Sequence, residues 1–132
     1  MLNPAGSPGA LLAAFREARF ELVLSIGLLA EIEEVLARPR IRSRLTVEPG
    51  AIESLLSLLE DRSLMVEPVD VPAISRDSDD DLVLATALAG GAEYLVTGDD
   101  DVRKDPNVIA HLEQRGVAVL TVAGFLDLLA SA

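Results

Sequence analysis

Short apolar segments alternate with helical segments of about ten residues along most of this 132-residue chain. Such alternation is typical of βαβ units, in which a helix returns the chain so that the next strand runs parallel to the first. The sequence therefore predicts a parallel sheet covered by helices on both faces, a three-layer α/β/α sandwich. Because the length is that of one ordinary domain, residues 1–132 are expected to form a single unit.

Caps and breakers set the expected boundaries of these segments. Ser25 suits the N-cap of a helix that ends ahead of Pro39, while Gly90 and Gly91 end a later helix. Strands are expected at residues 20–24, 64–69, 94–97 and 117–121. Helices are expected at residues 9–19, 26–37, 49–61, 80–89, 107–115 and 123–130.

Composition excludes several classes of protein. Half of the residues are apolar, which is enough for a core and excludes a disordered chain. With no cysteine and a single histidine, His111, the chain cannot form thiolate or multi-histidine metal sites, and His111 is expected to be structural. No apolar run suits a membrane span and no signal peptide is evident, so a cytoplasmic protein that does not contact membranes is expected.

The net charge constrains any interaction with nucleic acid. The 22 acidic and 11 basic residues give a charge of −11 at pH 7, which repels polyanions unless a metal ion or a local basic patch helps. Arg38, Arg40, Arg42 and Arg44 alternate along one short segment and are candidate ligands for nucleic-acid phosphates. The alternative is a solvated helix end, where cations are favoured by the helix dipole.

Seven of the 11 aspartates fall in two windows, residues 77–81 and 99–101. The helix that begins near Asp80 and the strand that ends near Thr97 cover similar distances, roughly 15 Å, at ~1.5 and ~3.3 Å per residue. Asp80 and Asp99 are therefore expected at one edge, the carboxyl end of the sheet, where open α/β folds bind ligands. Converging carboxylates without His or Cys favour Mg²⁺ or Mn²⁺, although ordinary helix capping is the alternative for each window.

The sequence excludes two other kinds of binding site, because the required residues are not at the required spacing. The run that begins at Asp77 has Leu82 where a calcium-binding EF-hand loop needs glycine and Leu88 where it needs glutamate. No phosphate-binding GxxxxGK[ST] loop is present.

Three segments are distinctive enough to compare with known families. They read SIGLLAEIEEVLARPR at 25–40, RDSDDDLVLATALAGGAEYLVTGDDD at 76–101 and VLTVAGFL at 119–126. Together they resemble the PIN-domain family, in particular the branch that acts as toxins in toxin-antitoxin pairs. The resemblance extends over essentially the whole chain, and the middle segment is its most specific part.

This resemblance implies a metal-dependent endoribonuclease, in which Mg²⁺ or Mn²⁺ activates water for attack on a phosphodiester. The implied metal-binding and catalytic acids, taken position by position, are Glu31, Asp80 and Asp99. The implied supporting residues are Asp77, Asp101 and Thr97. Helical periodicity alone does not distinguish Glu31 from Glu33, because both flank the apolar stripe of their helix.

The chain departs from the family at its N-terminus. Family members begin with an apolar strand, central in the sheet, that ends in a metal-binding aspartate, whereas this chain begins in the loop that follows. We therefore expect the first strand and first aspartate to be missing. Unpaired strand edges then predict a homo-oligomer. The incomplete acidic set predicts weak metal binding and slow or undetectable RNA cleavage.

Three functional hypotheses follow. The leading one is a PIN-type endoribonuclease, the toxin of a toxin-antitoxin pair, with RNA as substrate and an antitoxin protein as partner. The second is a catalytically impaired PIN-like remnant that binds a partner protein. The third, a receiver-like phosphoacceptor domain, is disfavoured because Lys104, the only lysine, lies outside a suitable strand end.

Overall fold

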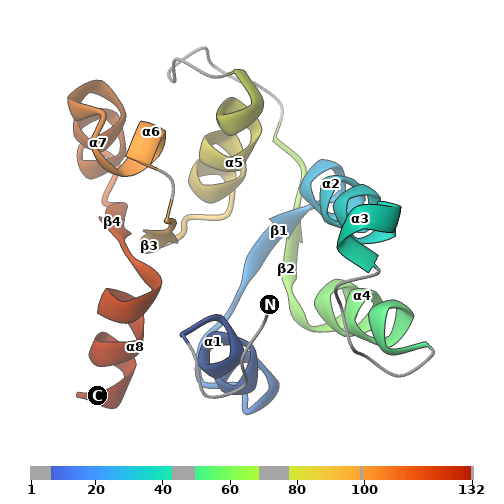
Figure 1. The fold of residues 1–132 in the computed structure, drawn as a ribbon. Coiled ribbons are helices and arrows are strands. Elements are labelled where there is room, and N and C mark those ends of the chain that lie inside the picture. The colour runs from blue at the N-terminus through green and yellow to red at the C-terminus, as the bar shows by residue number, and fades with distance from the viewer. Residues whose placement is uncertain (1–6, 43–49, 69–77, 99, 132) are drawn as a thin grey trace.

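The computed structural model describes residues 7–42, 50–68, 78–98 and 100–131. In the described chain, each strand is separated from the next by one or more helices (Figure 1). The elements are α1 (Ser7–Arg16), β1 (Val23–Ser25), α2 (Ile26–Ala37), α3 (Pro39–Arg42), α4 (Ala51–Arg62), β2 (Leu64–Val66), α5 (Ser78–Ala89), β3 (Tyr94–Val96), α6 (Asp100–Arg103), α7 (Pro106–Glu113), β4 (Ala118–Leu120) and α8 (Val122–Ala130).

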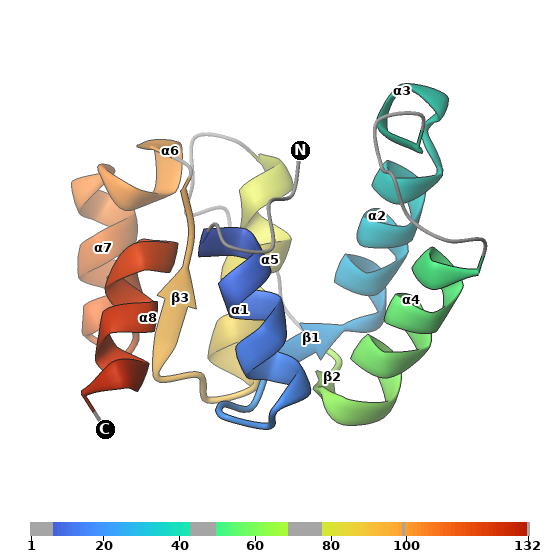
Figure 2. The ribbon, with the colours of Figure 1, turned by 60° about the horizontal axis from the view of Figure 1, so that its bottom comes forward.

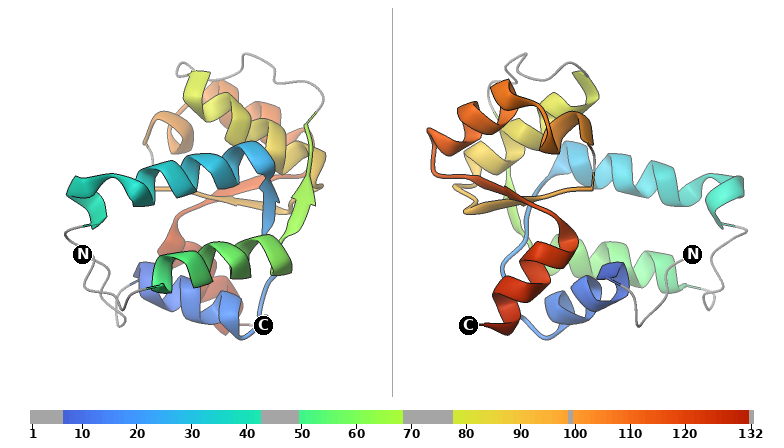
Figure 3. Two further views of the ribbon diagram at one scale, coloured as in Figure 1. Left: turned by 90° about the vertical axis from the view of Figure 1, so that its right-hand side faces the viewer. Right: turned by 60° about the vertical axis from the view of Figure 1, so that its left-hand side comes forward.

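The elements form three layers, with the strands between two groups of helices (Figure 3). Helices α2, α5, α6 and α7 lie on one side of the strands, and α1, α4 and α8 lie on the other. This arrangement confirms the predicted α/β/α architecture. Among the described residues, no helix is long and apolar enough to cross a bilayer.

The strands form two parallel pairs. Strand β1 pairs with β2 in the register Val23–Leu64, and β3 pairs with β4 in the register Tyr94–Ala118. In the part of the chain that the structure describes, no ladder joins β1 to β3. The sheet that the sequence predicts as one unit is thus divided between its two inner strands.

The best-packed part of the core lies between α5, α7 and the β3–β4 pair. Leu84 and Leu112, from the two helices, are completely buried, so these helices are fixed on one face of the pair. The full cluster comprises Leu84, Leu95, Val102, Val108, Leu112 and Val117. By contrast, α2 has no buried residue, and Val35, which periodicity places toward the core, is 38% exposed.

Helix boundaries follow local capping chemistry. Ser25 is the N-cap of α2, as predicted, and Asp105 and Thr121 cap α7 and α8 with their side-chain oxygens. Because Asp105 is the cap, α7 begins at Pro106, one residue earlier than the sequence suggested. Two short helices, α3 and α6, were not predicted, since four residues are too few to show a periodicity.

A buried pair of hydroxyl groups joins three elements. Ser25 Oγ, at the end of β1, accepts a hydrogen bond from the N–H of Leu28 at 3.2 Å. Thr86 Oγ1 of α5 lies 2.9 Å from Ser25 Oγ and 2.7 Å from the carbonyl oxygen of Leu82. All these contacts are satisfied when Thr86 donates to Leu82 and Ser25 donates to Thr86, since a hydroxyl both donates and accepts. This Ser25–Thr86 junction fixes α2 and β1 against α5.

Replacing Ser25 with alanine tests the junction. Ser25→Ala removes the N-cap and the partner of Thr86, and we expect a loss of about 1–2 kcal/mol in the free energy of unfolding, measured by urea denaturation. The control is Ser57→Ala at an exposed position inside α4, which should change stability by less than about 0.5 kcal/mol. Equal effects of the two substitutions would contradict the role assigned to Ser25.

Candidate functional site

The two aspartate-rich windows adjoin the same end of the molecule. Helix α5 begins at Ser78, and β3 ends at Val96 just before the short helix α6 (Figure 2). The start of α5, the end of β3 and α6 all lie at this end, which we call the acidic end. The geometry follows from the topology, because β3 returns antiparallel to α5 after the turn at Gly90 and Gly91.

Only some of the predicted acidic site residues lie among those that the structure describes. Asp80 lies in the first turn of α5, and Asp101 lies in α6, but only their backbones are described. Asp77 and Asp99 lie outside the described residues, although Gly98 and the backbone of residue 100 border Asp99. No group of three potential metal ligands is present among the residues that the structure describes.

Thr97 continues the β3–β4 ladder toward the acidic end. Its backbone N–H donates to the carbonyl oxygen of Leu120 at 2.9 Å, and its side chain is half-buried. The pairing therefore extends one residue beyond β3. It fixes the backbone just before Gly98 and Asp99.

Glu31 is an exposed residue on α2. Its position relative to α5 is set by a close contact between the two helices. A Cβ atom at Gly27 would lie 3.1 Å from Leu82 Cδ2, so α2 approaches α5 closely at this point. The two helices run in opposite directions (Figures 2 and 3). Glu31 follows Gly27 by about one turn on the same face, and Ser78 precedes Leu82 by about one turn. Glu31 therefore lies level with the first turn of α5.

This register separates Glu31 from Glu33, which the periodicity of α2 could not do. Glu33 is also exposed, but it lies two positions further along α2 and so points about 200° around the helix from Glu31, at ~100° per residue. Glu31 shares the face of Gly27, which contacts α5. Of the two glutamates, Glu31 is the one on the face of α2 that contacts α5.

Asp81 is a buried acid outside the predicted set of site residues. It is 5% exposed in the first turn of α5, and it has an interaction partner. The signal was present in the sequence: position 81 shares a helix face with Leu84, Ala85 and Leu88, which point to the core. A carboxylate on that face is withdrawn from solvent beside Asp80.

The arginine segment lies at the same end of the molecule as the acidic residues (Figure 2). Arg38 and Arg40 are exposed, and Arg38 Nη2 lies 3.7 Å from Glu34 Oε1. The side chain of Arg42 is not described, and Arg44 lies outside the described residues. An exposed pair such as Arg38–Glu34 is worth little energetically, so it does not prevent Arg38 from contacting a phosphate.

His111 has a local structural contact. It is half-buried on α7, and its Nδ1 lies 3.3 Å from Arg115 Nη1. Arg115 also donates to the backbone oxygen of His111 at 3.2 Å. These contacts agree with the structural role expected for this residue.

The donor chemistry of the acidic end fits a hard divalent cation. The side chains that the sequence brings there are carboxylates, with Glu31 exposed on a neighbouring helix and no cysteine in the chain. Carboxylate oxygens are the ligands that Mg²⁺ and Mn²⁺ prefer. The predicted ligands Glu31, Asp80 and Asp99 all carry the carboxylate oxygens that such an ion requires.

The fold and this end together define a class of protein: a three-layer α/β domain with acidic segments at the carboxyl end of parallel strands. A family model described as PIN domain matches residues 1–101, so the chain belongs to the PIN-domain family. PIN domains are typically nucleases, generally use divalent metals and bind RNA. No curated protein and no solved structure matches the chain. Membership in this family makes the receiver-like hypothesis wrong.

A metal titration tests whether Glu31 belongs to the acidic end. Millimolar Mn²⁺ should raise the melting temperature, because a ligand bound only to the native state stabilises it, by about 1.4 kcal/mol at ten times its Kd. Glu31→Gln should remove most of that rise, measured by differential scanning fluorimetry. The matched substitution Glu33→Gln should leave the rise intact, and a rise of equal size in all three proteins would place the ion elsewhere.

Proposed function

We propose that this chain is a metal-dependent endoribonuclease of PIN type, acting with Mg²⁺ or Mn²⁺. One observation carries the proposal: the first turn of α5, the end of β3 and the face of α2 that bears Glu31 lie at the same end of the molecule. Family membership supports the reaction class. The whole chain is proposed to act as one PIN-like unit.

The proposed roles follow from this placement. Glu31, Asp80 and Asp99 are proposed to hold the cation, which when bound supplies an activated water and stabilises charge on the phosphodiester. Asp77, Asp101 and Thr97 are proposed to position the metal-binding acids. The hydrogen bond from Thr97 N–H to Leu120 O supports the role proposed for Thr97, because this bond fixes the backbone shortly before Asp99.

RNA is the proposed substrate. The chain carries a charge of −11 at pH 7, so phosphate binding depends on local cations. Exposed Arg38 and Arg40 lie toward the same end of the molecule as the acidic residues, which supports their proposed contact with phosphates beside the metal. Arg42 and Arg44 are proposed to extend this contact.

The biological role proposed is that of the toxin in a toxin-antitoxin pair, with an antitoxin protein as partner. The resemblance of residues 76–101 to that branch supports it. The second candidate, a PIN-like module that binds protein without cleaving RNA, is favoured by the division of the sheet between β1 and β3. Cleavage measurements separate the two candidates.

Replacement of Asp80 tests the nuclease assignment. The purified chain should cleave single-stranded RNA slowly, in Mn²⁺ and not in EDTA. Asp80→Asn should lower that rate by at least about 100-fold, since loss of an acid that holds the ion removes several kcal/mol of transition-state stabilisation. Asp61→Asn, at an exposed position on α4, is the control and should cleave at the parental rate. Metal-independent cleavage, or equal rates for the two variants, would contradict the assignment.

The arginine segment is tested by the salt dependence of RNA binding. The double substitution Arg38→Ala and Arg40→Ala should weaken binding of unrelated RNA sequences equally. It should reduce the slope of log Kd against log salt by about 1.4, since each phosphate contact on a single strand contributes about 0.7. The control Arg16→Ala, at an exposed position on α1, should leave the slope unchanged. An unchanged slope in the double variant would mean that Arg38 and Arg40 do not contact RNA phosphates.

A further inference from the structure

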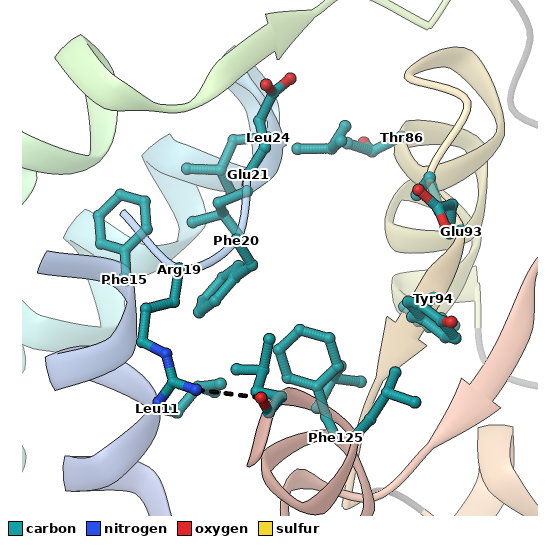
Figure 4. Close-up of a pocket in the computed structure, with 18 of the residues that line it drawn as sticks. Leu11, Phe15, Arg19, Phe20, Glu21, Leu24, Thr86, Glu93, Tyr94 and Phe125 are labelled. Atoms are coloured by element: carbon teal, nitrogen blue, oxygen red, sulfur yellow. Dashed lines mark hydrogen bonds between the residues drawn. The ribbon is translucent and has the colours of Figure 1, made fainter. Parts of the chain in front are cut away.

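Val35 is an exposed apolar residue that core packing does not explain. It lies in the last turn of α2, and 38% of its surface is accessible to solvent. Two other exposed apolar residues, Tyr94 and Leu128, line a cavity of about 1010 Å³ between β1 and β3 (Figure 4). Val35 is not part of that lining. It lies on the outer part of α2, about two turns beyond the contact of Gly27 with α5.

Val35 is a neighbour of Glu31 on the surface of α2. The two positions are four residues apart, so their side chains lie one turn from each other on the same side of the helix. Both residues are exposed. Because Glu31 is level with the first turn of α5 and the two helices run in opposite directions, Val35 lies about one turn past the start of α5. An apolar side chain thus adjoins a proposed metal ligand.

Arg38 lies on the other side of Val35, at the end of α2. Its backbone N–H donates to the carbonyl oxygen of Val35 at 3.2 Å, which fixes Arg38 directly after the last turn. Its side chain reaches back along the helix, and its Nη2 lies 3.7 Å from Glu34 Oε1. Val35 is therefore placed between a carboxylate proposed to hold the metal and a guanidinium proposed to bind phosphate.

The spacing of these two charged residues fits a short piece of a nucleic-acid strand. Seven residues of helix separate Glu31 from Arg38, roughly 10 Å at ~1.5 Å per residue. Successive phosphates of one strand are at least about 3.4 Å apart along its axis, so about three nucleotides or fewer span this distance. A strand that has its cleaved phosphate at the metal and another phosphate at Arg38 must pass Val35 with at least one nucleotide.

An exposed valine suits contact with a nucleobase. The flat face of a base is apolar, so covering Val35 with a base removes apolar surface from water on both partners. A β-branched side chain in a helix keeps essentially one rotamer, so Val35 loses little conformational freedom when it is covered. Every base has such a face, and the contact orients the nucleotide without selecting its sequence.

The surroundings of Val35 do not suit a protein partner. Its neighbours along this side of α2 are charged and exposed: Glu31, Glu34 and Arg38. Protein interaction sites generally expose contiguous apolar patches of more than roughly a few hundred Å². A single valine among charges is too small for such a site, but it is large enough to cover one base.

We propose that Val35 contacts the base of a nucleotide next to the cleaved phosphate, and so positions the RNA strand between the metal and Arg38. This inference rests on the proposed function, because it takes RNA as the substrate and Glu31 as a metal ligand. It adds to that function an uncharged contact that the acidic and basic residues do not supply.

Substitutions at Val35 should change the affinity for RNA without changing its salt dependence. Val35→Ala should weaken the Kd for a short single-stranded RNA by about fivefold, because apolar contact is lost. Val35→Tyr should tighten this Kd by about fivefold, because an aromatic ring stacks on a base. The Kd is measured by fluorescence anisotropy in Mn²⁺ before cleavage proceeds. The slope of log Kd against log salt should match that of the parent chain in both variants, since no phosphate contact changes.

Two matched controls separate this contact from general effects. Ile26 is also an exposed apolar residue of α2, but it lies nine positions before Val35 and half a turn around the helix from it. Ile26→Ala and Ile26→Tyr should leave the Kd unchanged. A strand of the same length without bases keeps the phosphates, and Val35→Ala and the parent chain should bind this abasic strand equally.

The inference is overturned if both Val35 variants bind RNA as the parent chain does, or if the Ile26 variants show the same changes. It is also overturned if Val35→Ala weakens binding of the abasic strand as much as binding of RNA. A parent chain that cleaves RNA while the Val35 variants bind unchanged removes this contact alone. A parent chain that binds RNA through Val35 without cleaving it removes the nuclease assignment alone, and a parent chain that does not bind RNA contradicts both.

Discussion

The buried hydrogen bond between Ser25 and Thr86 is the contact on which the arrangement of the acidic end depends. Ser25 ends β1 and caps α2, and Thr86 lies in the middle of α5, so one pair of hydroxyl groups fixes a strand and two helices together. The glycine at position 27 then allows α2 to approach Leu82. This contact sets the height of Glu31 relative to the start of α5. The serine that caps α2 thus also positions this helix, and with it Glu31, relative to α5.

The same junction fixes the β1–β2 pair to α5. Strand β1 is fixed to α5 through Ser25 and through the packing of Val23 beside Gly90, and β3 is fixed by the core that Leu84 and Leu95 share. The two pairs of strands are thus anchored to the same helix while their inner edges stay apart.

Much of this fold is predictable from local chemistry, and the remainder depends on tertiary contacts. The capping preference of Ser25 predicts the start of α2 correctly. The apolar segments predict all four strands to within a few residues. The choice between Glu31 and Glu33 came from family resemblance, since periodicity treats them alike; the physical reason is the packing of Gly27 on Leu82, which joins residues far apart in the sequence. Local sequence patterns do not predict the division of the sheet. The burial of Asp81 also depends on tertiary contacts, although its position on the apolar face of α5 indicates it.

The binding position of a paramagnetic ion tests the proposed metal site directly. In an NMR titration with substoichiometric Mn²⁺, we predict that the backbone amides of Glu31, Leu82 and Gly98 broaden together, although they come from three separate segments of the chain. The amides of Glu60 and Ser131, toward the opposite end of the molecule, should remain sharp. Broadening confined to one helix, or spread evenly over the acidic residues of the surface, would show that these elements do not form a common metal site.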